Sequence, residues 1–196
     1  FESCTGLTSI VIPNSVTAIG GDAFNNTAWY KNQPDGMVYA GKVAYKYKGT
    51  MPSGTNMTFK EGTLGIAGYA FEDCTRLTSI VIPNTVTSIG DGAFYNCSGL
   101  TSIVVESGNP RYDSRNNCNA IIETDYNNLI VGCINTIIPN TVTAIENSAF
   151  EDCSGLTGID IPNSVTAIGD YAFYNCSGLI SIVIPNSVTY IGDEAF

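Results

Sequence analysis

The sequence predicts a tandem-repeat solenoid, in which short coils of chain stack to form one continuous core. Three observations predict this fold class. Phenylalanine recurs at an interval of 23 residues, as from Phe71 to Phe94 and from Phe150 to Phe173. Leucine and isoleucine recur at the same interval, and 44% of all residues are hydrophobic, which is ample for a core. Self-similarity at a period of roughly 20 to 50 residues is typical of stacked repeats.

The first element of each coil is a short strand, which is clearest in the copy from Phe71 to Ala93. Residues 80–82 alternate in the manner of a strand, so Ile80 and Ile82 face inward. Pro83 then removes a backbone donor, and the asparagine that follows favours a turn, so the strand ends there.

The rest of the coil is a second extended segment and a turn. Residues 86–89 form the extended segment, Gly90-Asp91 turns the chain, and residues 93–97 form a tight segment that we expect to be one helical or 3-10 turn. One coil cannot bury its own apolar side, so neighbouring coils must stack. Stacking predicts three core columns: Leu7, Leu77, Leu100, Leu156 and Leu179; Ile10, Ile80, Ile103, Ile159 and Ile182; Phe24, Phe71, Phe94, Phe150 and Phe173.

Two irregular gaps interrupt the repeat. The phenylalanines that bound residues 24–71 are 47 positions apart, and those that bound residues 94–150 are 56 apart. We therefore interpret residues 1–196 as a single solenoid segment of eight periods and a little more. Its irregular stretches lie at about residues 27–56 and 106–136, and we call them the first and second irregular stretches.

The chain begins and ends at the same point of the repeat, at Phe1 and Phe196. This coincidence predicts a segment of a longer protein. Cut coils expose core and unpaired strand edges, so we also expect a tendency toward end-to-end self-association.

The spacing of Leu77, Ile80 and Ile82 is similar to the strand of a leucine-rich repeat, although Thr85 stands where the general pattern has Asn or Cys. The whole repeat reads L-x-x-I-x-I-P-x-x-V-x-x-I-G-x-x-A-F-x-x-C. It resembles the BspA-like leucine-rich repeats of host-associated bacteria, and several copies match at nearly every position. The expected fold is therefore a leucine-rich-repeat solenoid of β-rich, right-handed coils, with short strands on both sides and single helical or 3-10 turns. The two irregular stretches add hairpin-like insertions to it.

The resemblance also implies a class of function. Members of the family are typically surface or secreted proteins, and some are adhesins that bind host matrix or plasma proteins. The expected function is therefore a non-catalytic module that binds a protein or glycan in an extracellular or cell-surface setting. A structural spacer that presents other domains is the alternative, which the regularity of the repeat favours.

Composition excludes several other classes. The chain carries 8 Lys and Arg against 18 Asp and Glu, a net charge of −10, which disfavours nucleic acids and anionic membrane surfaces as partners. No apolar run approaches the roughly 20 residues that a membrane span needs. Histidine, a phosphate-cradling glycine loop and a convincing carboxylate pair are all absent, so we expect no catalytic residue and no cofactor.

Five of the seven cysteines lie three residues after a repeat phenylalanine: Cys4, Cys74, Cys97, Cys153 and Cys176. The second coil has Thr27 at this position, so we interpret the thiols as small buried residues of a stacked column. No C-x-x-C pair occurs, and the recurring acids lack the spacing of a calcium loop, so no metal site is expected.

Residues 27–62, which include the first irregular stretch, hold the only tryptophan and five of the eight basic residues. The candidate binding residues of this stretch are Trp29, Tyr30, Tyr39, Tyr45, Lys46, Tyr47 and Lys48. They could form an aromatic and basic contact patch, because tryptophan and tyrosine are good interface anchors. They could equally pack over the solenoid in place of the lost leucine and isoleucine columns.

The same stretch predicts a β-hairpin that turns at Ala40-Gly41. That register sets Val38 opposite Val43 and Asp35 opposite Lys46.

The second irregular stretch predicts another hairpin, with Asp125-Tyr126 at its tip and Ile122 paired with Leu129. This register places Cys118 opposite Cys133. A disulfide between them, if the protein is exported, and two thiols in a covered hairpin both remain open.

The outward positions of the first strand are small and nearly uncharged. The candidate contacts on this face are Ser9, Val11, Ser79, Val81, Ser102 and Val104. A solenoid face is a common binding surface. Columns of identical small residues can also serve only to pair neighbouring coils.

Overall fold

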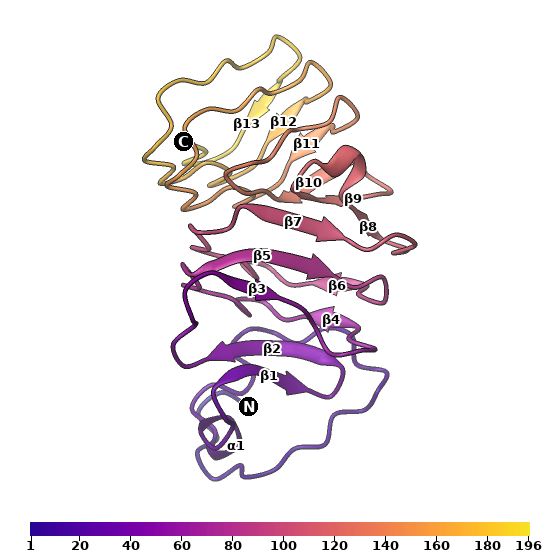
Figure 1. Cartoon of the computed structure of the whole chain (residues 1–196), viewed down its shortest axis with the longest axis vertical. Helices are drawn as coiled ribbons and strands as arrows, with labels where there is room; N and C mark the ends of the chain where they lie inside the picture. Colours follow the sequence, from indigo (N-terminus) through magenta and orange to yellow (C-terminus); the bar gives the residue numbers. More distant parts are fainter.

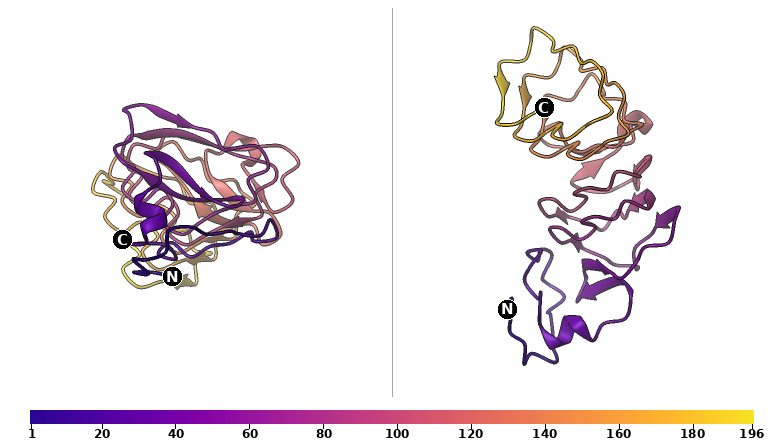
Figure 2. Two further views of the ribbon diagram at one scale, coloured as in Figure 1. Left: turned by 90° about the horizontal axis from the view of Figure 1, so that it is seen from below. Right: turned by 90° about the vertical axis from the view of Figure 1, so that its left-hand side faces the viewer.

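The computed structural model describes residues 1–196 and has the predicted architecture, a β-solenoid whose coils stack along the long axis of the molecule (Figure 1). The solenoid makes about six turns, fewer than the eight periods predicted from length. The difference arises because both irregular stretches place chain in hairpins. The stack is not straight: in the right-hand view of Figure 2, the C-terminal coils appear nearly face-on while the middle coils appear edge-on.

The first strand of the coil forms a three-stranded parallel sheet of β3 (Thr55–Met57), β5 (Leu77–Ile82) and β7 (Ser102–Val105). The second side of the coil begins with a sheet in the order β1-β2-β4-β6, of Gly36–Ala40, Val43–Lys48, Gly65–Ile66 and Ser88–Ile89. A six-stranded sheet in the order β13-β12-β11-β10-β9-β8 continues toward the C-terminus. Its strands, from β8 to β13, are Tyr112–Asp113, Ile121–Glu123, Asn128–Val131, Ala144–Ile145, Ala167–Ile168 and Tyr190–Ile191.

Helix is nearly absent. The only helices are α1 (Ala28–Lys31), which the hydroxyl of Thr27 caps by accepting the Tyr30 N–H at 3.1 Å, and the 3-10 helix η1 (Arg115–Asn117). Neither is long or apolar enough to cross a membrane.

The tight segment after Gly90 is a run of hydrogen-bonded turns. The N–H of Ala93 donates to the Gly90 carbonyl, but Gly92 and Asn96 adopt left-handed φ values of 61° and 51°, which break any helix. The same two left-handed positions recur in other coils, at Tyr69 and Asp73, Ser148 and Asp152, and Tyr171 and Asn175. We call this side of the solenoid the coil edge.

Neighbouring coils are joined along the coil edge by backbone hydrogen bonds at alternate residues, which we call the edge ladder. Its bonds run from Tyr69 N to Asp91 O (3.2 Å), Phe71 N to Ala93 O (2.8 Å) and Asp73 N to Tyr95 O (3.1 Å). The same three bonds join Ser148, Phe150 and Asp152 to Asp170, Ala172 and Tyr174 (2.9, 2.7 and 2.9 Å). Each coil therefore satisfies the N–H groups at alternate residues of its edge through its neighbour.

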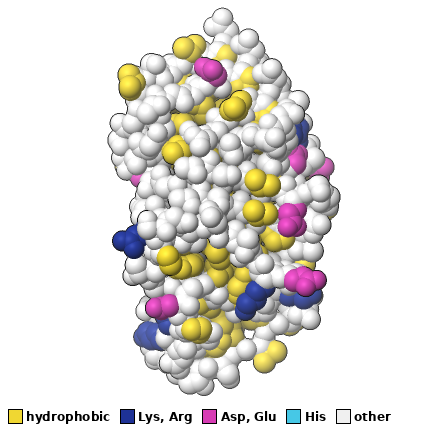
Figure 3. Space-filling model, in the orientation of Figure 1, with side chains coloured by type: hydrophobic (Ala, Val, Ile, Leu, Met, Phe, Trp, Pro, Cys, Tyr) yellow, Lys and Arg dark blue, Asp and Glu magenta, His cyan; other side chains and the backbone are white.

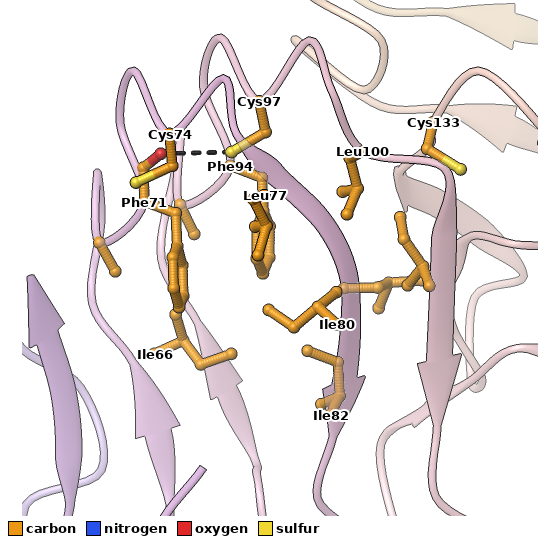
Figure 4. Close-up of a cluster of buried hydrophobic side chains, with 14 of the residues drawn as sticks. Ile66, Phe71, Cys74, Leu77, Ile80, Ile82, Phe94, Cys97, Leu100 and Cys133 are labelled. Carbon is orange, nitrogen blue, oxygen red and sulfur yellow. Dashed lines mark hydrogen bonds between the residues drawn. The ribbon is translucent and has the colours of Figure 1, made fainter. Parts of the chain in front are cut away.

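Stacked phenylalanine rings form the centre of the core beneath this ladder. The Phe71 and Phe94 rings stack with centroids 5.4 Å apart and planes 6° from parallel, and those of Phe150 and Phe173 stack at 4.9 Å and 7°. Figure 4 shows Phe71 and Phe94 with the leucine and isoleucine columns beside them. The core divides into three clusters, separated at the two irregular stretches.

The first hairpin exists, but its predicted register is wrong. The turn is Gly41-Lys42, so Ala40 pairs with Val43, and a bulge after Val38 sets that residue opposite Lys46. Gly41 adopts a left-handed φ of 62°, which suits the first position of a tight two-residue turn. Asp35 consequently lies outside the ladder and does not face Lys46.

The second hairpin follows its prediction at the tip. Ile122 lies opposite Leu129, and residues 124–127 form the turn. The register then shifts between Leu129 and Val131. The strict opposition that would have set Cys118 against Cys133 is therefore lost.

The phenylalanine column gives a direct test of this architecture. We expect Phe150→Ala to lower the free energy of unfolding by about 3–5 kcal/mol, because the ring is fully buried between coils. Urea unfolding followed by circular dichroism measures the change. Val104→Ala, at a position 44% exposed, is the control and should shift stability by about 0.5 kcal/mol or less. Equal losses for both variants would contradict the stacked-column core.

Candidate functional site

Tyr45 of the first irregular stretch is a core residue. Its ring is fully buried and lies 5.3, 6.3 and 5.6 Å, between centroids, from the rings of Phe24, Trp29 and Tyr30. Its hydroxyl accepts the Phe24 N–H at 3.0 Å and donates to Asn25 Oδ1 at 3.4 Å. Burial raises the pKa of this phenol to about 12. Tyr45 is therefore inaccessible to a partner, and it fills the place beside Phe24 that a coil phenylalanine takes elsewhere.

The basic candidates of the first stretch are engaged within the chain. Lys46 Nζ lies 3.1 Å from Glu72 Oε2, and Lys48 Nζ donates to the Lys31 carbonyl at 2.7 Å. Lys48 also lies 5.8 Å from the centroid of the Tyr30 ring.

The remaining aromatic candidates also have contacts within the chain. The Tyr39 hydroxyl accepts the Lys60 N–H at 3.0 Å, with the ammonium of that lysine 4.4 Å from the ring centroid. Tyr47 packs half-buried against the central core cluster and donates its N–H to Ala70 O at 2.8 Å. These contacts fit the packing interpretation of the stretch, although Trp29 and Tyr30 remain partly exposed.

We call the outward face of β3, β5 and β7 the strand face. In some of its columns the side chains form hydrogen bonds to a neighbouring coil, and in others they do not. The Thr78 and Thr101 hydroxyls each donate to the carbonyl of the equivalent threonine on the preceding coil, at 3.0 Å. The Ser79 hydroxyl donates to Asn56 Oδ1 at 2.6 Å. These residues hold coils together, as cross-strand pairs do.

The valine column of the strand face has no such role. Val81 pairs with Val104 in neighbouring strands, and Ser79 with Ser102, whereas Ser9 and Val11 lie on the first coil beyond this sheet. The exposed aliphatic side chains at outward positions are Val11 (94%), Val104 (44%), Ile137 (73%), Ile180 (88%) and Val183 (79%). Figure 3 shows scattered hydrophobic side chains on a face that is otherwise mostly uncharged.

Ile137 was missed by the sequence analysis. It lies at the end of the second irregular stretch, where Thr136 replaces the usual inward isoleucine and weakens the strand pattern. Alignment on Phe150 and Phe94 places Ile137 at the position of Val81, and this was the available signal.

The cysteines are structural thiols. The five column positions are buried except for Cys4, and the Cys97 Sγ lies 3.2 Å from the Phe71 carbonyl of the preceding coil (Figure 4). Burial raises the pKa of both Cys74 and Cys176 to about 11.

Cys118 and Cys133 are both free and buried in the structure. The Cys118 Sγ lies 3.8 Å from the Ala120 carbonyl, and the Cys133 Sγ lies 3.3 Å from the Asn119 carbonyl. The structure describes both as covered thiols, and the disulfide stays a prediction for the labelling experiment below. No group of three Cys, Asp or Glu side chains is arranged to hold a metal ion.

A cleft of about 570 Å³ opens at the coil edge, and no sequence pattern predicted it. One side is lined by residues 89–95 and Cys97, with Asn96 between the lining residues Tyr95 and Cys97. The other side is lined by residues 146–149 and Glu151, and the second irregular stretch contributes Tyr112 and residues 130–132. Phe94 lies at its inner end, where the phenylalanine column is interrupted. Tyr95 also lines the cleft, and the carboxylate of Asp152 on the opposite coil raises the pKa of its phenol.

Comparisons with known proteins agree with this geometry. The family described as BspA type leucine rich repeat region, in six copies, matches residues 42–128 and 121–196. A comparison with curated proteins finds no match.

Three similar solved structures come from bacteria. A leucine-rich repeat protein from Eubacterium ventriosum ATCC 27560 is 29% identical, with a TM-score of 0.62 over 98% of this chain and 51% of its own. The pneumococcal vaccine antigen PcpA is 17% identical, with a TM-score of 0.52 over 67% of this chain and 45% of its own. A leucine rich cell surface protein from Faecalibacterium prausnitzii A2-165 is 25% identical, with a TM-score of 0.49 over 70% and 49%. This chain thus spans only about half the length of these proteins.

Thiol labelling tests the assignment of the cysteines. In the native protein, we expect only Cys4 to react quickly with a thiol reagent at pH 8, because the others are buried and the thiolate is the reactive form. Since the pKa of Cys74 and Cys176 is about 11, raising the pH to 9 should leave them largely protonated and slow. After denaturation without reductant, all seven should react. A denatured count of five would show a disulfide and contradict the free thiols.

Proposed function

The chain belongs to the BspA-type leucine-rich repeat family, and on that premise we propose that it is a non-catalytic module that binds a protein or glycan at a bacterial cell surface. Leucine-rich repeat proteins from bacteria are generally interaction modules. Adhesion to a host component is the specific role that we propose for this module.

One observation supports the proposal most strongly: aliphatic side chains are exposed at the outward position of Val104 on the strand face and at the aligned positions of later coils. Val104, Ile137 and Val183 are 44%, 73% and 79% exposed at positions where the core gains nothing from an apolar side chain. Most of their neighbours are small and uncharged, and Asp160, at the aligned position between Ile137 and Val183, is the one charged residue of the column. Exposed aliphatic side chains that recur at one outward position of successive coils offer an interaction surface to an apolar partner.

The chemistry of the side chains supports a non-catalytic role. Six of the seven thiols are buried. Burial raises the pKa of Cys74 and Cys176 to about 11, so their nucleophilic thiolate form is scarce at neutral pH. The chain has no histidine to serve as a general base beside a hydroxyl nucleophile.

A structural spacer is the second candidate. The hydroxyls of Thr78 and Thr101 are used to join coils, as a purely structural rod would require. The exposed aliphatic residues have no place in that role, which is why we rank it second.

A binding screen distinguishes the two. The folded chain should bind at least one component of a panel of immobilised host matrix proteins, plasma proteins and glycans in a saturable manner. The double variant Val81→Lys and Val104→Lys should weaken that binding about tenfold or more, because two charges would be desolvated in an apolar contact. Tyr45 is unsuitable as a test site because its loss would disrupt the core.

The matched control is Asn163→Lys with Asn186→Lys, which adds the same charge at exposed turn positions away from the strand face. The control should bind like the parent chain. Equal weakening by both variants would exclude the strand face as the site. A folded chain that binds nothing in the panel would favour the spacer.

A further inference from the structure

The edge ladder is interrupted at both irregular stretches, and the second interruption, between residues 92–96 and residues 147–151, faces the cleft. Alignment of the repeat places Gly92, Phe94 and Asn96 at the positions whose N–H groups donate to the following coil elsewhere. None of these three N–H groups has an acceptor in the chain. They point along the coil edge from alternate residues, like the free side of a strand.

The opposite wall carries the complementary acceptors. Asn147, Ala149 and Glu151 occupy the positions whose carbonyls accept the ladder bonds in other coils. Only Ala149 O has a donor, the Gly132 N–H at 2.8 Å, and the carbonyls of Asn147 and Glu151 have none. The cleft therefore has backbone donors on one wall and backbone acceptors on the other.

The second irregular stretch causes this opening because it supplies a hairpin in place of a coil edge. Only Gly132 reaches the far wall, and it does so because it lacks a side chain: a Cβ there would lie 2.0 Å from Cε1 of Phe150. The first irregular stretch meets the same problem with Tyr45, whose hydroxyl takes the Phe24 N–H. In the second stretch the Tyr112 hydroxyl accepts the Ile89 N–H at 3.2 Å, so nothing reaches Phe94 N.

The cleft is strongly acidic. Its lining includes Asp91, Glu123, Glu146, Glu151 and Asp170 against the single cation Arg111. Arg111 already forms an ion pair, in which its Nη2 atom lies 2.9 Å from Oε1 of Glu123. Burial raises the pKa of Glu151, so this carboxylate is partly desolvated and a neighbouring cation would stabilise its charged form.

The wider charge distribution acts in the same direction. All eight Lys and Arg lie in residues 1–115, whereas nine of the 18 acids lie in residues 116–196. The wall formed by residues 146–153 and the coils beyond it thus carry negative charge alone. This field attracts cations and repels anions.

From these features we infer that the cleft binds an extended segment of a partner polypeptide that carries a lysine or arginine. The carbonyls of the segment accept the N–H groups of Gly92, Phe94 and Asn96, and its own N–H groups donate to the carbonyls of Asn147 and Glu151. The basic side chain lies among the acidic groups. This is strand addition to an open ladder, here at an internal junction of a solenoid.

Other ligand classes fit less well. A phosphate or carboxylate would use the free N–H groups but would meet five carboxylates. A neutral glycan offers hydroxyl groups to both walls but no cation. A volume of about 570 Å³ lies in the range of roughly 300–1,000 Å³ that is usual for ligand sites. The site lies on the coil edge and shares no residue with the strand face, so it is independent of the proposed function.

Amide chemical shifts of the isotope-labelled chain test the inference directly. The probe is an acetylated and amidated pentapeptide of sequence threonine-valine-lysine-valine-threonine. Saturable binding should shift the amide resonances of Gly92, Phe94 and Asn96 and slow their exchange with solvent. The same peptide with glutamate in place of lysine should not bind. Failure of the lysine peptide to shift these three amides, or equal binding of the glutamate peptide, would overturn the inference.

Charge variants provide the second arm. Glu146→Gln with Glu151→Gln should weaken the lysine peptide about tenfold, the effect of losing a charge-assisted contact. The control pair Asp125→Asn and Asp160→Asn removes the same charge from exposed sites outside the cleft and should change the affinity less than twofold. Equal weakening by both pairs would show attraction by net charge alone and overturn a specific site.

Two further outcomes separate this site from other possibilities. The strand-face variant Val81→Lys with Val104→Lys should leave the peptide shifts unchanged, so loss of one activity does not imply loss of the other. Neutral oligosaccharides that shift the three amides, in the absence of any shift by the lysine peptide, would reassign the cleft to glycans and overturn the inference.

Discussion

The backbone groups at the coil edge are the constraint on which the rest of this structure depends. Two left-handed residues in each edge turn, such as Tyr69 and Asp73, direct alternate N–H groups along the solenoid axis. A coil cannot satisfy these groups itself, and leaving them buried and unpaired would be costly. The next coil must therefore lie at strand spacing. Once it does, the phenylalanines that follow the turns are brought within 4.9 to 5.4 Å of each other and stack.

The two irregular stretches differ in how they satisfy the N–H groups of the coil edge. In the first, Tyr45 supplies both an aromatic ring beside Phe24 and an acceptor for its N–H, so the core closes. In the second, the hairpin of β9 and β10 continues the sheet on the far side of the coil, while the coil edge is left without an equivalent residue. The cleft lies between the core cluster that contains Phe94 and the cluster that contains Phe150. Both stretches interrupt the edge ladder, but the core closes at the first and a cleft is left at the second.

This difference explains how far the sequence could predict the molecule. The columns follow from a fixed period, so the fold class and core were predictable from Phe71, Phe94 and their equivalents. The tip of the second hairpin was predictable because Ile122 and Leu129 lie close to the turn. The first hairpin was misregistered because its turn is Gly41-Lys42 in place of Ala40-Gly41, and the bulge after Val38 then shifts the pairing by one further residue. The cleft could not be predicted because it forms where Phe94 and Glu151 face each other in space, and the whole second irregular stretch separates these residues in the sequence.

The candidate sites differ in a way that bears on recognition. The strand face is apolar and nearly uncharged, so a partner there gains chiefly from buried area and shape, with little dependence on salt. The cleft combines free backbone groups with Glu146 and Glu151, so a partner there is selected by charge and by an extended backbone. Because charged groups in a partly exposed cleft are screened by salt, occupancy of the cleft responds to ionic strength while contact with the strand face does not. A single partner that used both surfaces would need an apolar patch and a basic extended segment, a narrower requirement than either surface imposes alone.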